Sequence, residues 1–268
     1  MQAATLEQTL SPLTSDPSAA AVLLDVDGTL APIVTDADAA EVPAETRVAL
    51  AAVAERYAVV ACVTGRRPLK ARAMVGLGQI AYYGNHGAEY LGPGDEQPAV
   101  SPEAAQWQPR VREFADRVFA EYELGSLGVR TEDKGPIAGL HWRGCRDEDA
   151  ARRRIRDIAA EAEAAGLGTH WAKKILEIRP PILFSKGTAV SRILEQHELS
   201  AAAFIGDDLT DLNAFAALDE ARARGTITSA VKIGVDSDEA PAALGPASDV
   251  MLTGTDEVRA VLELLASA

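Results

Sequence analysis

The stretch AAAVLLDVDGTL, residues 19–30, decides the fold class of this chain. Its first six residues are all apolar, and two aspartates, Asp25 and Asp27, follow directly. A short apolar run that ends at a turn predicts a strand buried on both faces, as in a parallel sheet. Gly28 permits the sharp turn that comes next. Since ligands of doubly wound sheets bind at the carboxyl ends of the strands, both carboxylates are expected to face a site there.

Apolar runs of the same kind recur along the chain and alternate with helical patterns. The further strands expected are residues 57–63, 80–83, 201–205, 226–235 and 249–252. The helices expected between and after them are residues 43–56, 185–196 and 256–265. This alternation predicts an α/β fold with a doubly wound, Rossmann-like parallel sheet that is covered on both faces. The segment before about Ala19 is expected to be a short mobile arm.

The middle of the chain shows a different order of elements. A helix over residues 102–122 precedes two strands, 129–131 and 137–142. A long helix then runs from its cap, Asp147, to Gly166, and the strands 169–172 and 174–178 follow. This α-ββ-α-ββ order predicts an α+β domain, residues 101–180, inserted into a core made of residues 1–100 and 181–268. Hinges are expected near Gly92–Pro93 and Pro180–Pro181.

Composition restricts the partners of this protein. Its 268 residues include 26 Lys+Arg and 40 Asp+Glu, a formal charge of −14, which disfavours nucleic acids and anionic membrane surfaces. No stretch approaches the roughly 18 apolar residues of a spanning helix, and the start lacks the basic region of a signal peptide. The two cysteines, Cys62 and Cys145, are too few for a disulfide framework. We therefore expect a cytoplasmic monomer that acts on a small molecule.

Three further segments carry polar residues where strands end or helices begin. Thr64-Gly65-Arg66 offers a hydroxyl and exposed amides that suit a phosphate oxygen. Lys186 lies near the start of a helix, and Asp207 and Asp208 follow a strand. Because Mg²⁺ prefers oxygen ligands and commonly shares a phosphate, these segments together predict a metal-plus-phosphate site. Asn85 and His86 follow another strand and are expected near the substrate.

The two aspartates after the first strand suit different chemical roles. Asp25 is expected to bind the metal together with Asp207 and to act as a nucleophile that forms an acyl phosphate. Asp27 is expected to offer its backbone carbonyl to the metal. Its carboxyl group would protonate the leaving oxygen and later deprotonate a water. Two roles are equally open for Asp211: it lies beside the metal, or it is simply an acidic residue in the first turn of a helix.

These segments, in this order, resemble the motifs of the haloacid dehalogenase (HAD) superfamily of phosphotransferases. The resemblance implies a nucleophile at Asp25 and an acid/base at Asp27 within the DxDGT motif. It also implies that Thr64 and Lys186 are the second and third motif residues, and that Asp207-Asp208 is the acidic fourth motif that holds Mg²⁺.

A finer resemblance, to trehalose-6-phosphate phosphatases, covers most of the chain. It rests on the segments 24–33, 64–66, 84–89, 132–135, 141–143, 177–180 and 206–211. It implies that the inserted domain is a cap that closes over the sugar. Within that cap, Glu132, Lys134 and Glu177 would hold sugar hydroxyls, and His141 and Arg143 would support or line its polar face. Whether a synthase docks on this protein as a partner cannot be read from the sequence.

One departure from the family pattern keeps alternatives open. The family usually has Glu after Gly-Asp-Asp-x-Thr-Asp, whereas this chain has Leu212. Another sugar phosphate, of the sucrose 6-phosphate or glycosyl phosphate type, is therefore a second possible substrate. A phospho-accepting signalling receiver also uses an Asp, a Thr or Ser, a Lys and an acidic pair on a doubly wound sheet. The acid at Asp27 and the inserted domain disfavour that alternative.

Overall fold

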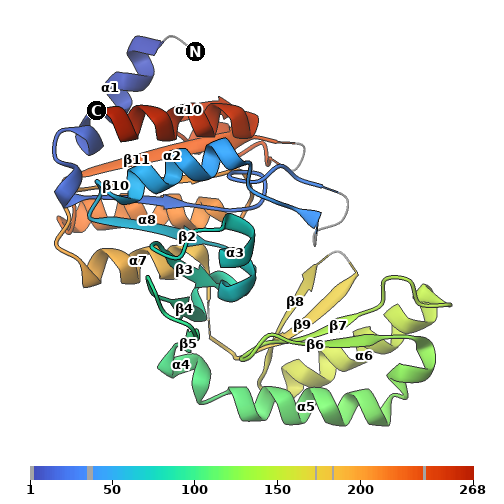
Figure 1. Cartoon of the computed structure of the whole chain (residues 1–268). Coiled ribbons are helices and arrows are strands. Elements are labelled where there is room, and N and C mark those ends of the chain that lie inside the picture. The colour runs from blue at the N-terminus through green and yellow to red at the C-terminus, as the bar shows by residue number, and fades with distance from the viewer. Residues whose placement is uncertain (1–2, 35–38, 173, 183, 238–239) are drawn as a thin grey trace. The chain divides into compact units, whose positions relative to one another are not determined.

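The structure, a computed structural model, describes residues 3–34, 39–172, 174–182, 184–237 and 240–268. The chain divides into two compact units (Figure 1). Unit 1 combines Met1–Ala99 with Phe184–Ala268, and unit 2 is Val100–Leu183. The domain boundaries predicted from the sequence lie after residues 100 and 180.

Unit 1 is built on an eight-stranded sheet whose order is β12-β11-β10-β1-β2-β3-β4-β5. Its strands are β1 (Ala20–Leu24), β2 (Val59–Val63), β3 (Ala81–Gly84), β4 (Glu89–Leu91), β5 (Ala99–Val100), β10 (Ala201–Gly206), β11 (Ser229–Asp236) and β12 (Val250–Thr253). The strands from β12 to β3 pair in parallel, and β4 runs antiparallel to β3. β1 lies between β2 and β10, which are distant in sequence, so three strand ends from separate parts of the chain meet at one edge.

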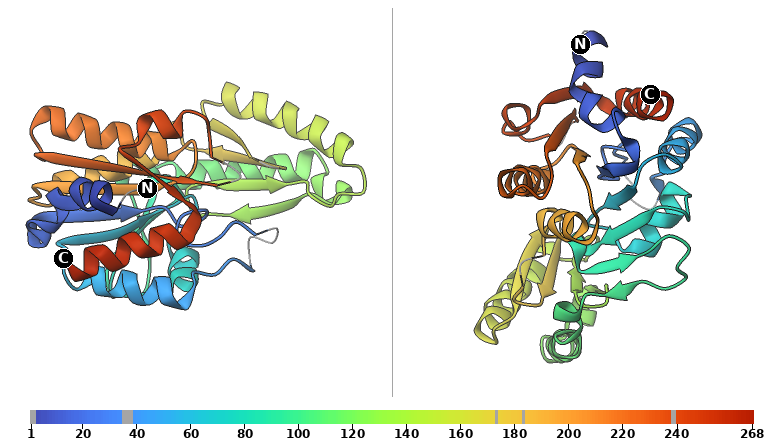
Figure 2. Two further views of the ribbon diagram at one scale, coloured as in Figure 1. Left: turned by 90° about the horizontal axis from the view of Figure 1, so that it is seen from above. Right: turned by 90° about the vertical axis from the view of Figure 1, so that its left-hand side faces the viewer.

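The central strand β1 is apolar on both faces because helices cover both. Alternate residues of β1 point to opposite sides of the sheet. Ala20, Val22 and Leu24 pack with the helices α1 (Ala3–Thr14), α2 (Ala44–Ala54), α3 (Pro68–Val75) and α10 (Gly254–Ser267). Ala21 and Leu23 pack with α7 (Lys186–Gln196), α8 (Asp211–Arg224) and α9 (Leu244–Ala247), and Figure 2 shows helices on both sides of this sheet. The predicted doubly wound α/β core is confirmed.

The N-terminal segment differs from what the sequence predicts. The expected mobile arm is instead the helix α1, although Pro12 lies within it. Leu6, Leu10 and Leu13 recur at helical spacing and are buried in the core of unit 1. Burying such a side chain contributes about 1.5–3 kcal/mol, which is enough to fix the segment on the core.

Unit 2 has the predicted order of elements and a four-stranded antiparallel sheet, β6-β7-β9-β8. The strands are β6 (Arg130–Asp133), β7 (Ala138–His141), β8 (Gly168–Ala172) and β9 (Ile175–Arg179). The expected helix over residues 102–122 is two helices, α4 (Pro102–Ala105) and α5 (Gln108–Glu121). Pro109 lies in the first turn of α5, where a missing N–H costs nothing, and so favours a new helix start there.

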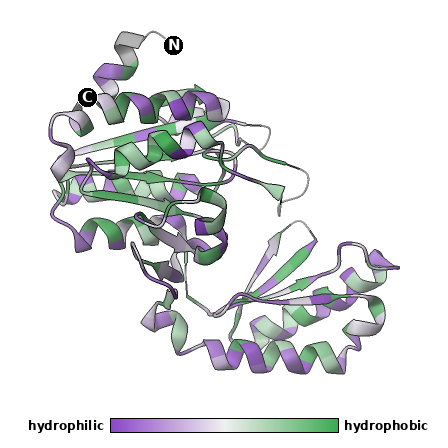
Figure 3. Cartoon of the chain, viewed as in Figure 1, coloured by the Kyte–Doolittle hydropathy of each residue, from purple (hydrophilic) through white to green (hydrophobic). Residues whose placement is uncertain are grey.

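The core of unit 2 lies on one face of its sheet. Leu140, Leu176 and Ile178 pack against apolar residues of α5 and of α6 (Glu148–Ala164), such as Phe114 and Ile155. Both helices alternate hydrophobic and hydrophilic residues, whereas the strands of unit 1 are largely hydrophobic (Figure 3). The opposite face of the unit 2 sheet is polar. Among the described residues, no helix is both long and apolar enough to cross a membrane.

Candidate active site

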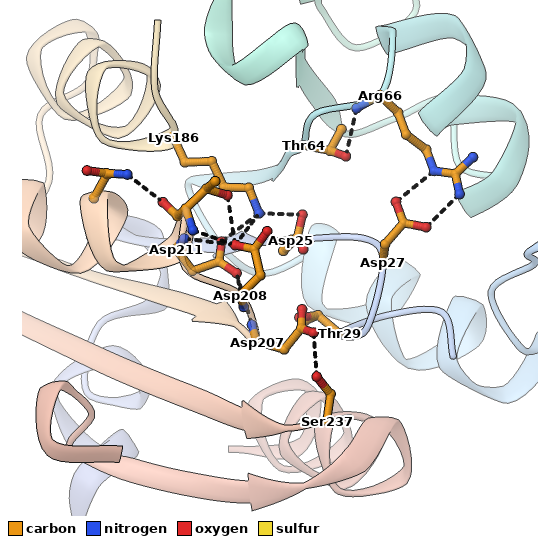
Figure 4. A network of polar contacts seen from close by, with 12 residues as sticks. Asp25, Asp27, Thr29, Thr64, Arg66, Lys186, Asp207, Asp208, Asp211 and Ser237 are labelled. Carbon is orange, nitrogen blue, oxygen red and sulfur yellow. Dashed lines mark hydrogen bonds and ion pairs between the residues drawn. The ribbon is translucent and has the colours of Figure 1, made fainter. Parts of the chain in front are cut away.

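The candidate site lies where β1, β2 and β10 end (Figure 4). The backbone N–H of Asp25 donates to the carbonyl of Ile205 at 2.9 Å, which continues the pairing of β1 with β10 to the aspartate itself. The N–H of Thr64 donates to the carbonyl of Tyr83 at 2.9 Å, so β2 ends in the same way beside β3. The side chains of both residues are buried. The parallel register therefore fixes the nucleophile candidate and the hydroxyl at neighbouring strand ends.

Lys186 brings its charge into this buried edge. Its ammonium nitrogen lies 2.9 Å from Asp25 Oδ1, 2.7 Å from Asp211 Oδ1 and 3.6 Å from Asp208 Oδ1, and the lysine is 2 % exposed. The residue begins α7, whose N-terminus carries a capping box formed by Ser185 and Thr188. That cap holds the helix start and thereby the stem of the lysine. A single cation is thus in contact with the carboxylates that follow two different strands.

Asp211 organises the loop after β10 rather than facing outward. One of its oxygens, Oδ2, accepts from the backbone N–H groups of Asp207 and Asp208, each at 2.9 Å. The other, Oδ1, accepts from Lys186. Asp208 Oδ1 in turn accepts from the backbone and hydroxyl of Thr210, at 2.8 and 2.7 Å, as side chains at helix starts commonly do. The acidic loop is therefore held by its own side chains.

Three buried aspartates form the cluster best suited to a cation among the described residues. Asp25, Asp207 and Asp211 each place one carboxylate oxygen within 4.8 Å of the others. Such oxygens are the ligands that hard divalent cations take. The metal residues predicted from the sequence were Asp25, Asp27, Asp207 and Asp208. The cluster contains the first and third of these, and the roles of Asp27 and Asp208 stay predictions.

The charge balance of this cluster shifts the pKa values of its members. Burial raises the pKa of Asp25 to about 7, although Lys186 opposes the shift. Burial likewise raises the pKa of Asp207 to about 6 and that of Asp211 well above its usual range. Burial disfavours the charged form of Lys186, but Asp211, Asp25 and Asp208 outweigh it and raise the lysine pKa. One lysine does not compensate the negative charge that the fold places here.

Asp27 points away from the cluster and toward Arg66 (Figure 4). The guanidinium donates to both oxygens of Asp27, from Nε at 2.7 Å and from a terminal nitrogen at 2.6 Å. This fork-to-fork geometry is the strong form of an arginine–carboxylate pair. The backbone N–H of Arg66 also donates to the hydroxyl of Thr64, at 3.2 Å. The predicted acid/base and the predicted phosphate ligand are thus bound to each other in this structure.

The Asn85-His86 loop lies beside the second motif. The backbone N–H of Asn85 donates to the carbonyl of Arg66, and that of His86 to the carbonyl of Thr64. A side chain on Gly65 would come within 3.0 Å of the His86 ring, so the glycine allows this close approach. The amide nitrogen of Asn85 donates to the buried Glu89 at 2.5 Å. The roles of Gly65, Asn85 and His86 toward a substrate stay predictions.

In unit 2, four of the predicted sugar-binding residues share the polar face of the sheet. The strand register aligns Glu132 with Gly139 and Gly139 with Glu177. Lys134 Nζ lies 2.8 Å from Glu177 Oε1, and His141 Nε2 lies 2.7 Å from Glu132 Oε2. Arg143 is exposed in the turn after β7, and its role toward a substrate stays a prediction.

Glu177 is the centre of that polar face. Arg179 Nε donates to its second oxygen at 3.0 Å, while Lys134 holds the first. Burial opposes ionisation of Glu177, but Arg179 and Lys134 outweigh it and lower its pKa to about 2. Glu177 is therefore an ionised acceptor at neutral pH.

Several residues of the two groups were missed by sequence reasoning. Arg179 and His170 lie beside Glu177, and β-strand alternation from Glu177 to Arg179 was an available signal for the first. Thr29 and Ser237 donate to Asp207 at 3.3 and 2.8 Å. Thr29 belongs to the DxDGT motif, whereas nothing in the residues around Ser237 indicates its position.

A doubly wound core whose central strand ends at a buried aspartate, with an α+β domain inserted in it, is the arrangement of haloacid dehalogenase-like hydrolases. A solved hydrolase of that kind from Bacteroides thetaiotaomicron superposes with a TM-score of 0.62 at 15% identity. The match covers 91% of this chain and 98% of that one. This likeness shows a shared fold.

The chain belongs to the trehalose-phosphatase family, whose sequence model matches residues 23–244. A trehalose-phosphate phosphatase of Mycolicibacterium paratuberculosis is 33% identical over 240 residues, and a trehalose 6-phosphate phosphatase of Zea mays is 34% identical over 215. These matches cover 84% and 74% of this chain, respectively, but only 57% and 58% of the relatives. The chain thus spans somewhat over half the length of the curated relatives it matches.

Two solved structures extend the comparison across more than nine-tenths of the chain. A trehalose-6-phosphate phosphatase related protein has a TM-score of 0.68 at 25% identity, covering 92% of this chain and 97% of that one. The C-terminal domain of the C. albicans trehalose-6-phosphate phosphatase has a TM-score of 0.71 at 20% identity, covering 98% of this chain and 96% of that one. The second likeness shows a shared fold.

Proposed function

We propose that this protein is a Mg²⁺-dependent phosphatase that hydrolyses trehalose 6-phosphate to trehalose and phosphate through an aspartyl-phosphate intermediate. The observation that carries the proposal is the buried contact of Lys186 with Asp25 at 2.9 Å, in a cluster that has more carboxylates than cations. A cationic partner beside an aspartate at a strand end suits phosphoryl transfer to that aspartate. Trehalose 6-phosphate is proposed as the substrate from the names of the relatives.

The residues present fit a divalent cation. Asp25 and Asp207 would hold it with their carboxylates, and Asp27 with its backbone carbonyl. Asp211 is less suited to direct contact, because its two oxygens already accept from Lys186 and from two backbone N–H groups. Bound Mg²⁺ supplies charge neutralisation, which lets an anionic carboxylate meet an anionic phosphate.

The chain's own residues would then perform two displacements. Lys186 and the Thr64 hydroxyl bind phosphate oxygens while Asp25 attacks phosphorus and the bond to the sugar oxygen breaks. Asp27 gives a proton to that oxygen, which leaves as a sugar hydroxyl. In the second step, Asp27 takes a proton from a water that attacks the phosphorus, and the carboxylate of Asp25 is released. For this work Asp27 has to leave Arg66, which the substrate phosphate can draw to itself.

We propose that the polar face of unit 2 binds the sugar. Glu132, Lys134, His141 and Glu177 offer donors and acceptors that suit the hydroxyls of a neutral disaccharide, and Arg143, in the turn after β7, would add a further donor. Glu177 is fully ionised, so it accepts from hydroxyls, while Lys134 donates. Charged partners favour polyols because a bound hydroxyl then gains a charge-assisted hydrogen bond.

A second substrate is kept open by Leu212. This residue, where the family pattern has Glu, packs partly buried against the apolar core of unit 1 and offers no carboxylate. Another phosphorylated disaccharide is therefore the alternative substrate.

Phosphate release from a panel of sugar phosphates, with Mg²⁺ and with a chelator, tests the proposal. We expect trehalose 6-phosphate to be preferred over sucrose 6-phosphate and glucose 6-phosphate, and turnover to vanish without metal. Asp25→Asn should reduce kcat at least about 10³-fold without changing the circular-dichroism spectrum, because it removes the nucleophile. A preference for sucrose 6-phosphate would select the alternative, and near-normal turnover by Asp25→Asn would reject the nucleophile. Phosphorylation in stoichiometric amount without turnover would indicate a signalling receiver instead.

A further inference from the structure

Asp207 differs from the other two aspartates of the cluster in the kind of partner that it has. Asp25 and Asp211 contact Lys186, whereas no cationic side chain lies within ion-pair distance of Asp207 in the part of the chain that the structure describes. Its hydrogen-bond donors are two neutral hydroxyls: Thr29 to Oδ1 at 3.3 Å and Ser237 to Oδ2 at 2.8 Å. Asp207 is nevertheless only 1 % exposed.

Ser237 reaches Asp207 because β11 is longer than the strand beside it. The pairing of β10 with β11 ends at Gly206 and Gly234, and Asp207 follows immediately on β10. β11 continues through Asp236, where it still pairs with Thr253 of β12, and Ser237 comes next. The serine hydroxyl therefore lies over the end of the shorter strand, and Figure 4 shows it directed at Asp207 from the side opposite Lys186.

The backbone on the β1 side leaves Asp207 little freedom. A side chain on Gly28, whose φ is +78°, would come within 2.1 Å of Asp207 Oδ2. Between this glycine and the two hydroxyls, the carboxylate has one well-defined orientation. The 3.3 Å contact from Thr29 is longer than the roughly 2.5–3.0 Å that is usual for a hydroxyl donor, so the bond from Ser237 is the one that orients the group.

We propose that Ser237 is a positioning residue that orients Asp207 for a divalent cation. It occupies Oδ2 and leaves Oδ1, which carries the weaker contact, to the metal. A neutral donor is suited to this task because it satisfies one oxygen without cancelling the charge that attracts the cation. Partners of this kind commonly decide how strongly a carboxylate binds its metal. The inference rests on the proposed function only in requiring a cation at the cluster.

The test is a titration of the metal-free protein with Mg²⁺ in the absence of substrate, by calorimetry and by the metal-induced rise in Tm. Ser237→Ala removes the hydroxyl, and Ser237→Thr keeps one at the same place. Ser248→Ala is the matched control, because that hydroxyl donates at 2.7 Å to the carbonyl of Leu244, in the same unit but outside the candidate site. Circular dichroism of each metal-free variant checks that it is folded.

We expect Ser237→Ala to weaken Mg²⁺ binding by about tenfold or more. Ser237→Thr and Ser248→Ala should bind within about twofold of wild type. In the phosphatase assay, Ser237→Ala should regain most of its kcat at saturating Mg²⁺, which a general loss of structure would not allow. A wild-type protein that binds Mg²⁺ and a Ser237→Ala variant that binds it equally well would overturn the role of Ser237 alone. A wild-type protein that binds no Mg²⁺ would overturn the proposed cofactor together with it.

Discussion

Each unit holds an ionic cluster, which is buried in unit 1 and partly buried in unit 2, and the two clusters differ in charge balance. In unit 1 one cation, Lys186, contacts Asp25 and Asp211 and lies 3.6 Å from Asp208. In unit 2 one anion, Glu177, contacts two cations, Lys134 and Arg179. The pKa values respond accordingly, since that of Asp25 rises to about 7 and that of Glu177 falls to about 2.

The cluster in unit 1 lacks positive charge, whereas the charges of the cluster in unit 2 balance each other. The aspartates of unit 1 favour protonation when no further cation is present, so the cluster is set up to gain from a divalent metal. Glu177 is already ionised and needs nothing more, so unit 2 is suited to a neutral ligand. The net charge of −14 extends the argument, because the field of the whole protein does not attract a phosphate. Attraction of the substrate has to come from cations within about 8 Å, such as Mg²⁺, Lys186 and Arg66.

Removing Lys186, the cation that contacts the aspartates of the unit 1 cluster, gives the largest expected effect. Lys186→Met should lower kcat about a thousandfold, because it removes a preorganised charge from the phosphate site. It should also lower the stability of unit 1 by about 3–5 kcal/mol at neutral pH, because Asp25 and Asp211 stay buried without their cationic partner. The lysine pKa is raised in the folded state, so its contribution is present below about pH 10.5 and is lost only above it. Phosphatase assays and differential scanning calorimetry measure the two effects.

Lys232→Met is the matched control for that change. Lys232 forms an ion pair at 2.8 Å with Asp219, also in unit 1, away from the candidate site. We expect its turnover to equal that of the wild type. If Lys186→Met and Lys232→Met lose the same small amount of activity, the positive charge of Lys186 does not contribute to catalysis.

The strand-end part of the site could be predicted from the sequence, because parallel topology brings strand ends together whatever the loops do. Asp25, Lys186 and Asp207 were placed in one site, and they are close in the structure. Ser237 could not be predicted, since its place depends on how far β11 extends past β10, which is a tertiary property. The contacts of Arg66 with Asp27 join residues 39 positions apart and depend on the side-chain rotamers.

What the sequence analysis missed in the fold also depends on tertiary contacts. Leu6, Leu10 and Leu13 recur at helical spacing, but the segment was predicted to be mobile because terminal segments often are. Its packing partners in the core of unit 1 appear only in the structure. In unit 2 the register was the missing information. Glu132 and Glu177 belong to strands joined through Gly139, and only that pairing aligns them on one face.

The second prediction perturbs the charge-balanced cluster. Lys134→Met should raise KM for trehalose 6-phosphate about thirtyfold, the loss expected when a charged hydrogen bond of about 2 kcal/mol disappears. The kcat at saturating substrate should stay within about threefold of wild type, because Lys134 holds no reacting atom. Steady-state kinetics measure this split. A variant that loses kcat as strongly as Lys186→Met would contradict the division of labour between the two clusters.

The smallest expected effect is in the acid stability of unit 2. The pKa of Glu177 is lowered in the folded state, so its ionised form stabilises unit 2 above about pH 4.5, and this contribution is lost as the pH falls toward about 2. Glu177→Gln removes the titration, so the free energy of unfolding of the variant should approach that of wild type as the pH falls from 7 to 3, by about 1 kcal/mol once solvent screening is allowed for.

Tryptophan fluorescence during urea unfolding measures that change in unit 2 alone, because the three tryptophans of the chain, Trp107, Trp142 and Trp171, all lie there. Glu163→Gln is the matched control, since Glu163 lies at the exposed end of α6 and its carboxylate accepts only from the hydroxyl of Thr169 among the described residues. Its free energy of unfolding should stay within about 0.5 kcal/mol of wild type, as for most exposed substitutions. If the difference between Glu177→Gln and wild type is constant from pH 7 to pH 3, Glu177 is not held ionised by Lys134 and Arg179. The contrast with the aspartates of unit 1 would then rest on burial alone.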